Sequence, residues 1–130
     1  MERTKMRAAT ERGFDAWRAA MRWQRSVDQA LRPLGLTHTR FLVLSAAAQA
    51  CHEQKDAVAQ VLIAERAGLD AATTSGIARR LERDGLIDRG PDGVDARHWR
   101  VLVTRSGYDA LRRAAPAVDS AATRFFEDRR

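Results

Sequence analysis

The apolar positions in the first quarter of the chain repeat at the spacing of a helix. Residues 8–31 contain one such face, because side chains three or four positions apart lie together on a helix. This face consists of Phe14, Trp17, Met21, Gln24, Asp28 and Leu31. Trp23 falls on a different side, with several alanines. A helix with two apolar sides is expected where one side packs on its own domain and the other meets a second subunit.

Capping residues divide the middle of the chain into three further predicted helices. Thr37 is placed to cap the first of them, since a threonine oxygen accepts a hydrogen bond from a free amide of the first turn. Asp56 is expected to cap the second helix and Gly68 to close it. Asp70 is expected to cap the third, which Gly85 ends. The tight turn AGLD therefore joins two helices.

A short β-hairpin is predicted directly after these helices. A strand begins at Leu86, and residues 90–93 have the glycine and proline of a turn. Residues 98–103 then alternate between apolar and polar side chains, which is typical of a half-buried strand. A final helix is predicted from about residue 105 towards residue 126. Pro116 is expected to kink that helix or divide it in two.

The order of these elements predicts a mainly α fold with a small β-hairpin wing. A helix-turn-helix followed by a hairpin is a winged helix, and the second helix of the pair enters the DNA major groove. With 130 residues the chain suits one domain. It is long enough to bury a core without a disulfide or a metal.

Charge indicates a polyanionic partner but does not place it on the wing. The formal net charge is +6, and only Lys5 and Lys55 are lysines among the 23 basic residues. A basic chain favours a nucleic acid as partner. Residues 1–40, however, have a balance of +5, whereas residues 70–105 have a balance of +1. DNA recognition must therefore depend on individually placed arginines rather than on net charge.

The segment GLDAATTSGIARRLERDGLIDRG, followed by DARHWRVLVTRSG, resembles the MarR family of bacterial transcription regulators. The resemblance covers about residues 10–126 and includes the upstream GLTHTRFLVL. It implies a single MarR-like domain over residues 1–130, with a winged helix-turn-helix DNA-binding lobe at about 37–104 and dimerisation helices at 8–31 and 105–130. The implied function is a dimeric repressor that a small aromatic or phenolic ligand releases from a pseudo-palindromic operator.

The third of the capped helices supplies the first candidate DNA contacts. Its outward side lies opposite a predicted buried face of Thr74, Ile77 and Leu81, and its small or hydroxyl side chains let the helix enter the groove. Gly76 costs about 1 kcal/mol relative to alanine. Either a close approach to DNA or close packing against a neighbouring helix explains it, and many relatives carry arginine there. Arg80 matches a common family arginine towards the flank. The candidates are Ala72, Thr73, Ser75, Gly76, Arg79 and Arg80.

The predicted wing supplies the second set of candidates. Arg97 resembles the family's hairpin arginine, which reaches into the minor groove, where the potential favours a cation. Asp95 is placed to brace it by a charge-assisted hydrogen bond, and a solvated charge pair is the alternative. For Arg89 and Arg100, a plain exposed charge and a phosphate contact are both open. Trp99 is interpreted as core under the wing rather than as a base-stacking residue.

The resemblance also implies an interface between two copies and a ligand pocket. Trp23 is the best single candidate for the dimer interface. The candidates on the last helix are Leu111, Val118, Phe125 and Phe126. Relatives often bind small aromatic acids between the dimerisation helices and the DNA-binding lobe. The candidates for such an effector pocket are Trp17, Met21, His38 and Phe41, for which plain core is the alternative.

The sequence offers no other chemistry of comparable specificity. No catalytic constellation is present, so neither an enzyme nor a cofactor is expected. Cys51 and His52 supply two ligands where four are typical, so no metal is expected. A single cysteine and the lack of a long apolar run indicate a cytoplasmic protein without a membrane partner. Two alternatives stay open: a winged-helix protein-interaction module that does not read DNA, and a thiol redox-sensing regulator acting through Cys51.

Overall fold

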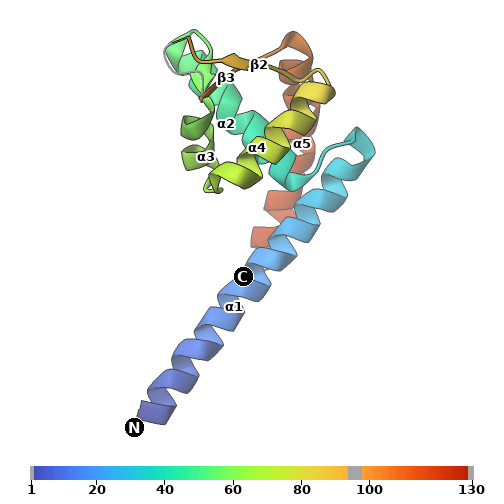
Figure 1. Ribbon diagram of the computed structural model, residues 1–130. Helices are drawn as coiled ribbons and strands as arrows, with labels where there is room; N and C mark the ends of the chain where they lie inside the picture. The colour runs from blue at the N-terminus through green and yellow to red at the C-terminus, as the bar shows by residue number, and fades with distance from the viewer. Residues whose placement is uncertain (1, 94–97, 129–130) are drawn as a thin grey trace.

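A small sheet lies at one end of a group of helices, as the computed structural model shows for residues 2–93 and 98–128 (Figure 1). The predicted mainly α fold with a β-hairpin wing is confirmed. In chain order the elements are α1 (Glu2–Leu31), the 3-10 helix η1 (Arg32–Leu34), α2 (His38–Gln54), β1 (Val58–Ala59), α3 (Gln60–Ala67), α4 (Ala71–Arg83), β2 (Ile87–Pro91), β3 (Trp99–Val103) and α5 (Arg105–Glu127).

The first helix is longer than its apolar pattern predicts. It begins at Glu2 rather than at residue 8, because residues 2–7 are mostly good helix formers and include neither glycine nor proline. Its C-terminal part lies along α5, while its N-terminal part extends away from the rest of the chain (Figure 1). Only Val27 and Leu31 are buried on it. Most of α1 therefore has no packing partner among the residues that the structure describes.

Two predicted N-caps and one C-cap are confirmed. The Thr37 hydroxyl accepts a hydrogen bond from the Arg40 amide at 3.2 Å, and the Asp70 carboxylate accepts one from the Thr73 amide at 2.7 Å. Gly68 closes α3 in the left-handed conformation, with φ of 70°. These positions follow from local chemistry, because each cap satisfies backbone groups within a few residues.

The prediction that Asp56 caps the next helix is wrong. Its carboxylate accepts the amide of Ala57 instead, and α3 begins at Gln60 after the two-residue strand β1. Val58 of that strand pairs with Val101 in an antiparallel sheet of order β1-β3-β2. The reason is long-range, since a strand this short has no alternation to detect and exists only because β3 offers it a partner.

The last helix is not divided at Pro116, which lies inside the continuous span of α5. Its beginning is fixed by a close backbone contact. The Thr104 hydroxyl donates to the Gly85 carbonyl at 2.7 Å and accepts the Gly107 amide at 3.1 Å. A Cβ on Gly107 would lie 2.7 Å from Cγ1 of Val103 and closer still to the Leu86 carbonyl oxygen. The VTRSG sequence thus joins the hairpin to α5 without room for a side chain.

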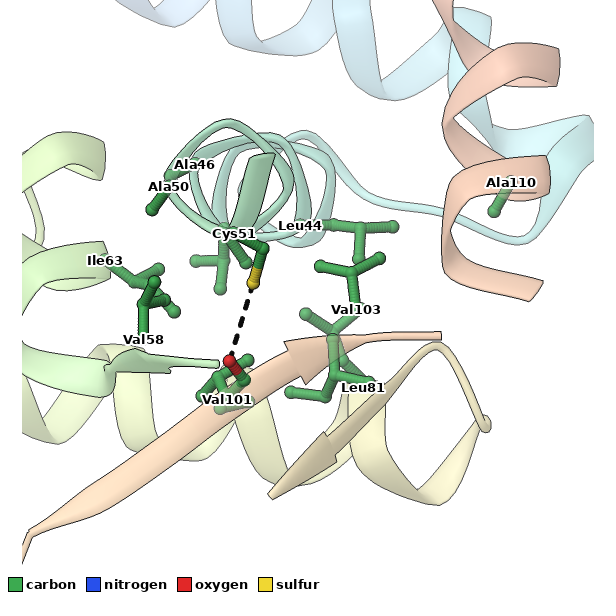
Figure 2. Packing of buried hydrophobic residues seen from close by; sticks show 14 residues of the cluster. Leu44, Ala46, Ala50, Cys51, Val58, Ile63, Leu81, Val101, Val103 and Ala110 are labelled. Atoms are coloured by element: carbon green, nitrogen blue, oxygen red, sulfur yellow. Dashed lines mark hydrogen bonds between the residues drawn. The ribbon is translucent and has the colours of Figure 1, made fainter. Parts of the chain in front are cut away.

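The main core lies between α2, α3, α4 and the sheet (Figure 2). Leu44, Ile63 and Leu81 are fully buried there, and the side chain of Cys51 points from α2 towards β3. A second, smaller cluster joins α1 to α5. It consists of Val27, Leu31, Leu36 and Ala114, with Trp23, Phe41, Leu86 and Val118 packed against it. The main core positions α4 and the hairpin, which carry the candidate DNA contacts.

Candidate nucleic-acid interface

The outward side of α4 is the first part of the candidate interface. Thr74, Ala78 and Leu81 are buried beneath it. Ile77, predicted to share that buried face, is half-buried against the main core. On the outward side, Ala72, Thr73, Arg79 and Arg80 are exposed, and Ser75 and Gly76 are half-buried. All six of the predicted α4 contacts therefore lie on the side away from the most deeply buried residues.

The backbone at Gly76 is open to an approaching molecule. Within residues 2–93 and 98–128, a Cβ there would meet only the Nη2 atom of Arg79, at 3.8 Å. Close packing against a neighbouring helix, one of the two explanations for this glycine, is therefore wrong. Arg79 in turn donates from Nη1 to the Ser75 hydroxyl at 3.3 Å. The guanidinium is thus held across the glycine, at the surface of the helix.

The N-terminal turn of α4 is held by Asp70. Its carboxylate accepts hydrogen bonds from both the amide and the hydroxyl of Thr73, at 2.7 and 2.8 Å. These two bonds hold the pKa of Asp70 below its usual value, because they favour the charged form. The Thr73 hydroxyl already donates to Asp70, so it is left to accept a hydrogen bond from a base edge.

Arg80 lies at the flank of the outward side. Its Nε atom donates to the Asp84 carboxylate at 3.2 Å, and Nη1 of Arg40 lies 3.8 Å from the same carboxylate. The acid therefore connects α4 to the beginning of α2. This contact agrees with support of the fold, and a phosphate contact of Arg80 stays a prediction.

Neither Arg89 nor Arg100, for which an exposed charge and a phosphate contact were both open, is an exposed residue of the hairpin. Asp95 and Arg97 lie outside the described residues. The Arg89 side chain is only 6% exposed, with Glu82 as its ion-pair partner, so a plain exposed charge is wrong for it. Arg100 donates to the Ala57 carbonyl oxygen and is half-buried. Trp99 is not core under the wing, since it is 43% exposed.

A hollow of about 470 Å³ lies between α3, the N-terminal end of α4 and the hairpin. Val61 and Trp99 form part of its apolar wall. The hydroxyl oxygen of Thr74, which also lines it, is the one buried side-chain polar atom without a partner among the described residues. Sequence reasoning missed this hollow because Trp99 was assigned to the core.

Three of the predicted dimer residues meet within a single chain. The Trp23 ring lies 5.3 Å from the Phe125 ring and 6.1 Å from the Phe126 ring, measured between centroids. Phe126 remains 61% exposed. Leu111 packs against the main core and Val118 against the smaller cluster. The aromatic cluster therefore joins α1 to α5 and leaves an apolar edge uncovered.

None of the four hollows found among the described residues is lined by all four predicted effector residues. Trp17 and Met21 line a hollow of about 220 Å³ on α1, together with Arg18, Arg22 and Arg25. His38 is instead buried, 5.9 Å from the Trp23 ring, and Phe41 packs against the smaller cluster. Burial lowers the pKa of His38 below its ordinary value, and the nearby Asp28 carboxylate opposes that change.

Cys51 is enclosed by the main core. Its thiol donates to the Val101 carbonyl at 3.5 Å (Figure 2), and the residue is buried. Reactive thiols are partly exposed and lie in electropositive surroundings. The geometry therefore disfavours the thiol redox-sensing alternative. Among the described residues, no cluster of three or more His, Cys, Asp or Glu side chains is arranged to bind a metal ion.

None of the helices in the described part of the chain combines the length and the apolar character that crossing a membrane requires. This finding concerns residues 2–93 and 98–128.

Comparisons with known proteins agree with this geometry. The model of the MarR family matches residues 36–99. The HTH-type transcriptional regulator YdcH of Bacillus subtilis is 30% identical over 117 residues, which are 90% of this chain and 79% of that protein. A MarR-family transcriptional regulator of Rhodococcus sp. RHA1 is 31% identical, with a TM-score of 0.78 over 92% of this chain and 81% of its own.

Two further solved structures are similar in a bound state. CouR of Rhodococcus jostii RHA1, bound to p-coumaroyl-CoA, is 33% identical, with a TM-score of 0.74 over 88% of this chain and 78% of its own. MosR of M. tuberculosis, in complex with DNA, is 29% identical, with a TM-score of 0.72 over 85% and 77% of the two chains. The chain therefore belongs to the MarR family of transcription regulators, which are winged-helix DNA-binding proteins and not enzymes.

Proposed function

We propose that the protein is a dimeric, sequence-specific repressor in the cytoplasm, which a small aromatic ligand releases from a pseudo-palindromic operator. The observation that carries the DNA-reading part is the open backbone of α4 at Gly76. Because no neighbouring helix covers this point, α4 is free to sink into the major groove until its backbone approaches the bases. This explains a glycine that otherwise costs about 1 kcal/mol of helix stability.

Arg79 is the proposed base-reading cation. It is exposed, and its contact with Ser75 limits the directions in which the guanidinium can point. A guanidinium that donates to both acceptors of a guanine contributes about 1–3 kcal/mol of discrimination against other bases. Thr73 and Ser75 add hydroxyl contacts beside it, and Arg80 adds a phosphate contact at the flank. Arg97, braced by Asp95, is the proposed minor-groove contact of the wing.

The proposed homodimer places two such helices on one operator. In one chain, Phe14 is 55% and Trp17 is 61% exposed on α1, and a second copy would cover them. Two α4 helices related by a two-fold axis fit half-sites about one helical turn apart. A similar regulator in complex with DNA, MosR, supports the DNA partner.

The proposed ligand is an aromatic acid or one of its derivatives. CouR, a similar regulator, is bound to p-coumaroyl-CoA, which joins a phenolic ring to a phosphorylated carrier. In this chain the hollow on α1 combines the Trp17 ring with Arg18, Arg22 and Arg25. A hollow at the border of the proposed dimer surface, with one aromatic ring and three cations, suits a ligand that has both an aromatic part and negative charge.

The experiment begins with selection of duplexes from a random-sequence pool by the full-length protein. We expect enrichment of an inverted repeat, and a fall in affinity of at least 10-fold between 50 and 200 mM salt as phosphate contacts release counterions. Arg79→Ala should weaken the selected duplex by at least 10-fold and relax one base position. Arg112→Ala, which removes an exposed arginine of α5, is the matched control. A pool that yields no enriched duplex would identify an interaction module instead.

The ligand and the dimer are tested on the same duplex. Sedimentation should give two chains per duplex, and p-coumaroyl-CoA or free phenolic acids should release it in a titration. A monomeric complex would contradict the proposed dimer. No release by any acid or thioester of this class would contradict the proposed effector.

A further inference from the structure

Arg89 is a buried cation in the middle of the hairpin. It lies in β2 directly opposite Val101 of β3, and residues opposite each other in a ladder share a face of the sheet. Val101 is fully buried, and the Arg89 side chain is 6% exposed. Since a buried charge is costly unless it is paired and hydrogen-bonded, the surroundings of this guanidinium indicate what it does.

The guanidinium connects four elements. Nε and Nη2 donate to the Glu82 carboxylate of α4, at 3.3 and 3.2 Å. Nη1 donates to the side-chain oxygen of Gln60, the first residue of α3, at 3.3 Å. The guanidinium carbon lies 4.6 Å from the centre of the Trp99 ring in β3. One planar cation thus contacts both helices of the helix-turn-helix and both strands of the hairpin.

These contacts leave Arg89 poorly suited to touch DNA itself. Each of its three nitrogens already donates within the protein, and one face of the group is covered by Trp99. Arg79 and Arg80, by contrast, are exposed on α4. A phosphate that reached Arg89 would have to displace Glu82, which is an acid.

We propose that Arg89 is a positioning residue for DNA recognition, which fixes the angle between the hairpin and α4 through Glu82, Gln60 and Trp99. Glu82 follows Arg79 by three residues on α4, so the carboxylate that holds the hairpin lies one turn from the proposed base-reading group. The fixed angle sets the distance between contacts in the major groove and contacts in the adjacent minor groove. The inference rests on the proposed DNA-binding function and adds a residue that acts without touching DNA.

Removal of Glu82 is expected to change DNA affinity in the direction opposite to the one that its charge alone predicts. Removal of an acid from a DNA-binding lobe should strengthen binding, because less negative charge faces the phosphates. If Glu82 holds Arg89 in place, Glu82→Ala should instead weaken binding of the selected duplex by at least 5-fold. Asp88→Ala is the matched control, since it removes an exposed acid from the same hairpin. That variant should bind equally well or more tightly.

A second variant separates geometry from charge. Arg89→Lys keeps the positive charge but loses the planar fork that reaches two partners at once. A positioning role predicts a loss of at least 10-fold, and the double variant with Glu82→Ala should lose little more than Arg89→Lys alone. Near wild-type affinity of Arg89→Lys, or gains for Glu82→Ala like those of Asp88→Ala, would assign Arg89 to a phosphate contact and overturn the proposal.

A measurement on the free protein tests the same contact without DNA. Amides of β2 and β3 should exchange with solvent at least 10-fold faster in Glu82→Ala, while amides of α2 keep their wild-type rates. Unchanged exchange in the hairpin would overturn the positioning role even where DNA binding is normal. A protein that selects no duplex but has the altered exchange would overturn the DNA-binding function and the role of Arg89 in it, and leave only a structural contact.

Discussion

Apolar side chains are buried in the DNA-binding lobe, whereas similar side chains on the first helix are exposed. In the lobe, from α2 to β3, side chains such as Leu44, Ile63 and Leu81 are fully buried. On α1, a helix of 30 residues, only Val27 and Leu31 are buried. Phe14 and Trp17, which lie on the face of α1 with the clearest apolar spacing, are more than half exposed.

The spacing of apolar residues in a sequence thus predicts a helix, but it does not predict which surface will cover the apolar face of that helix. The core of the lobe is enclosed by α2, α3, α4, the sheet and the first part of α5. Most of α1 extends beyond these elements (Figure 1). Changes to buried contacts of the lobe should therefore alter the stability of the single chain, whereas removal of exposed apolar side chains on α1 should alter association. Four experiments, in order of decreasing effect, test this contrast.

The largest effect is expected where the lobe meets α5. Gly107→Ala should destabilise the protein by about 3 kcal/mol, because an added methyl has no room between backbone and core at the contact with Leu86 and Val103. Urea unfolding with a tryptophan signal measures it. Gly13→Ala on α1 is the control, since nothing lies within 4 Å of a Cβ there. It should stabilise the helix by about 1 kcal/mol, and equal effects of the two changes would abolish the contrast.

The next effect concerns association through α1. Trp17→Ala should raise the dissociation constant of the dimer about 30-fold, which corresponds to about 2 kcal/mol for an aromatic anchor at an interface. Sedimentation over a range of concentrations measures it. Val61→Ala, a change to an exposed apolar residue of the lobe, should leave the dimer intact. Loss of the dimer in Val61→Ala alone would place the interface on the lobe.

A smaller effect separates stability from DNA binding within α4. Gly76→Ala should raise the midpoint of urea unfolding, since alanine favours a helix by about 1 kcal/mol and the added Cβ meets only Arg79. The same change should weaken binding of the selected duplex about 10-fold, or about 1.4 kcal/mol, by blocking close approach. Gly13→Ala is the control, because it should raise helix stability by a similar amount without weakening DNA binding. Unaltered DNA affinity in Gly76→Ala would show that α4 keeps its backbone away from the bases.

The smallest effect is a pH dependence at the joint between the two regions. Burial lowers the pKa of His38 in the folded chain below the ordinary value of 6.5, so the unfolded chain takes up a proton first as the pH falls. The stability that neutral His38 contributes is present above that value and is lost as the pH falls below it. Between pH 7.5 and 5, wild type should therefore lose more of its free energy of unfolding than His38→Gln does. Urea unfolding at both pH values measures it. His52→Gln, which changes an exposed histidine, should follow wild type.

Sequence reasoning succeeds here where chemistry is local. Thr37 and Asp70 were predicted as caps because a cap and its amide lie within three residues of each other, and both hydrogen bonds are present. Gly68 and Gly85 adopt positive φ where helices were expected to end. The outward side of α4 follows in the same way from its period and from the buried Thr74 and Leu81.

It fails where a residue depends on elements far away in the chain. Asp56 is a residue type that often caps helices. Because Val58 pairs with Val101 in the sheet, however, α3 begins only at Gln60. Arg89 is a hairpin arginine by sequence, and its burial depends on Gln60, 29 positions earlier, and on Glu82. The roles of Asp95 and Arg97 stay predictions, because both residues lie outside the described part of the chain.

The Thr104–Gly107 contact has a mechanical consequence. Thr104 alone separates the end of β3 from the start of α5, and its hydroxyl holds both the Gly85 carbonyl and the first turn of that helix. No flexible loop separates β3 from α5 there. If α5 rotates when the contacts at its C-terminal end change, the hairpin must therefore rotate with it. Movement at one end of this helix is thereby converted into tilt of the wing.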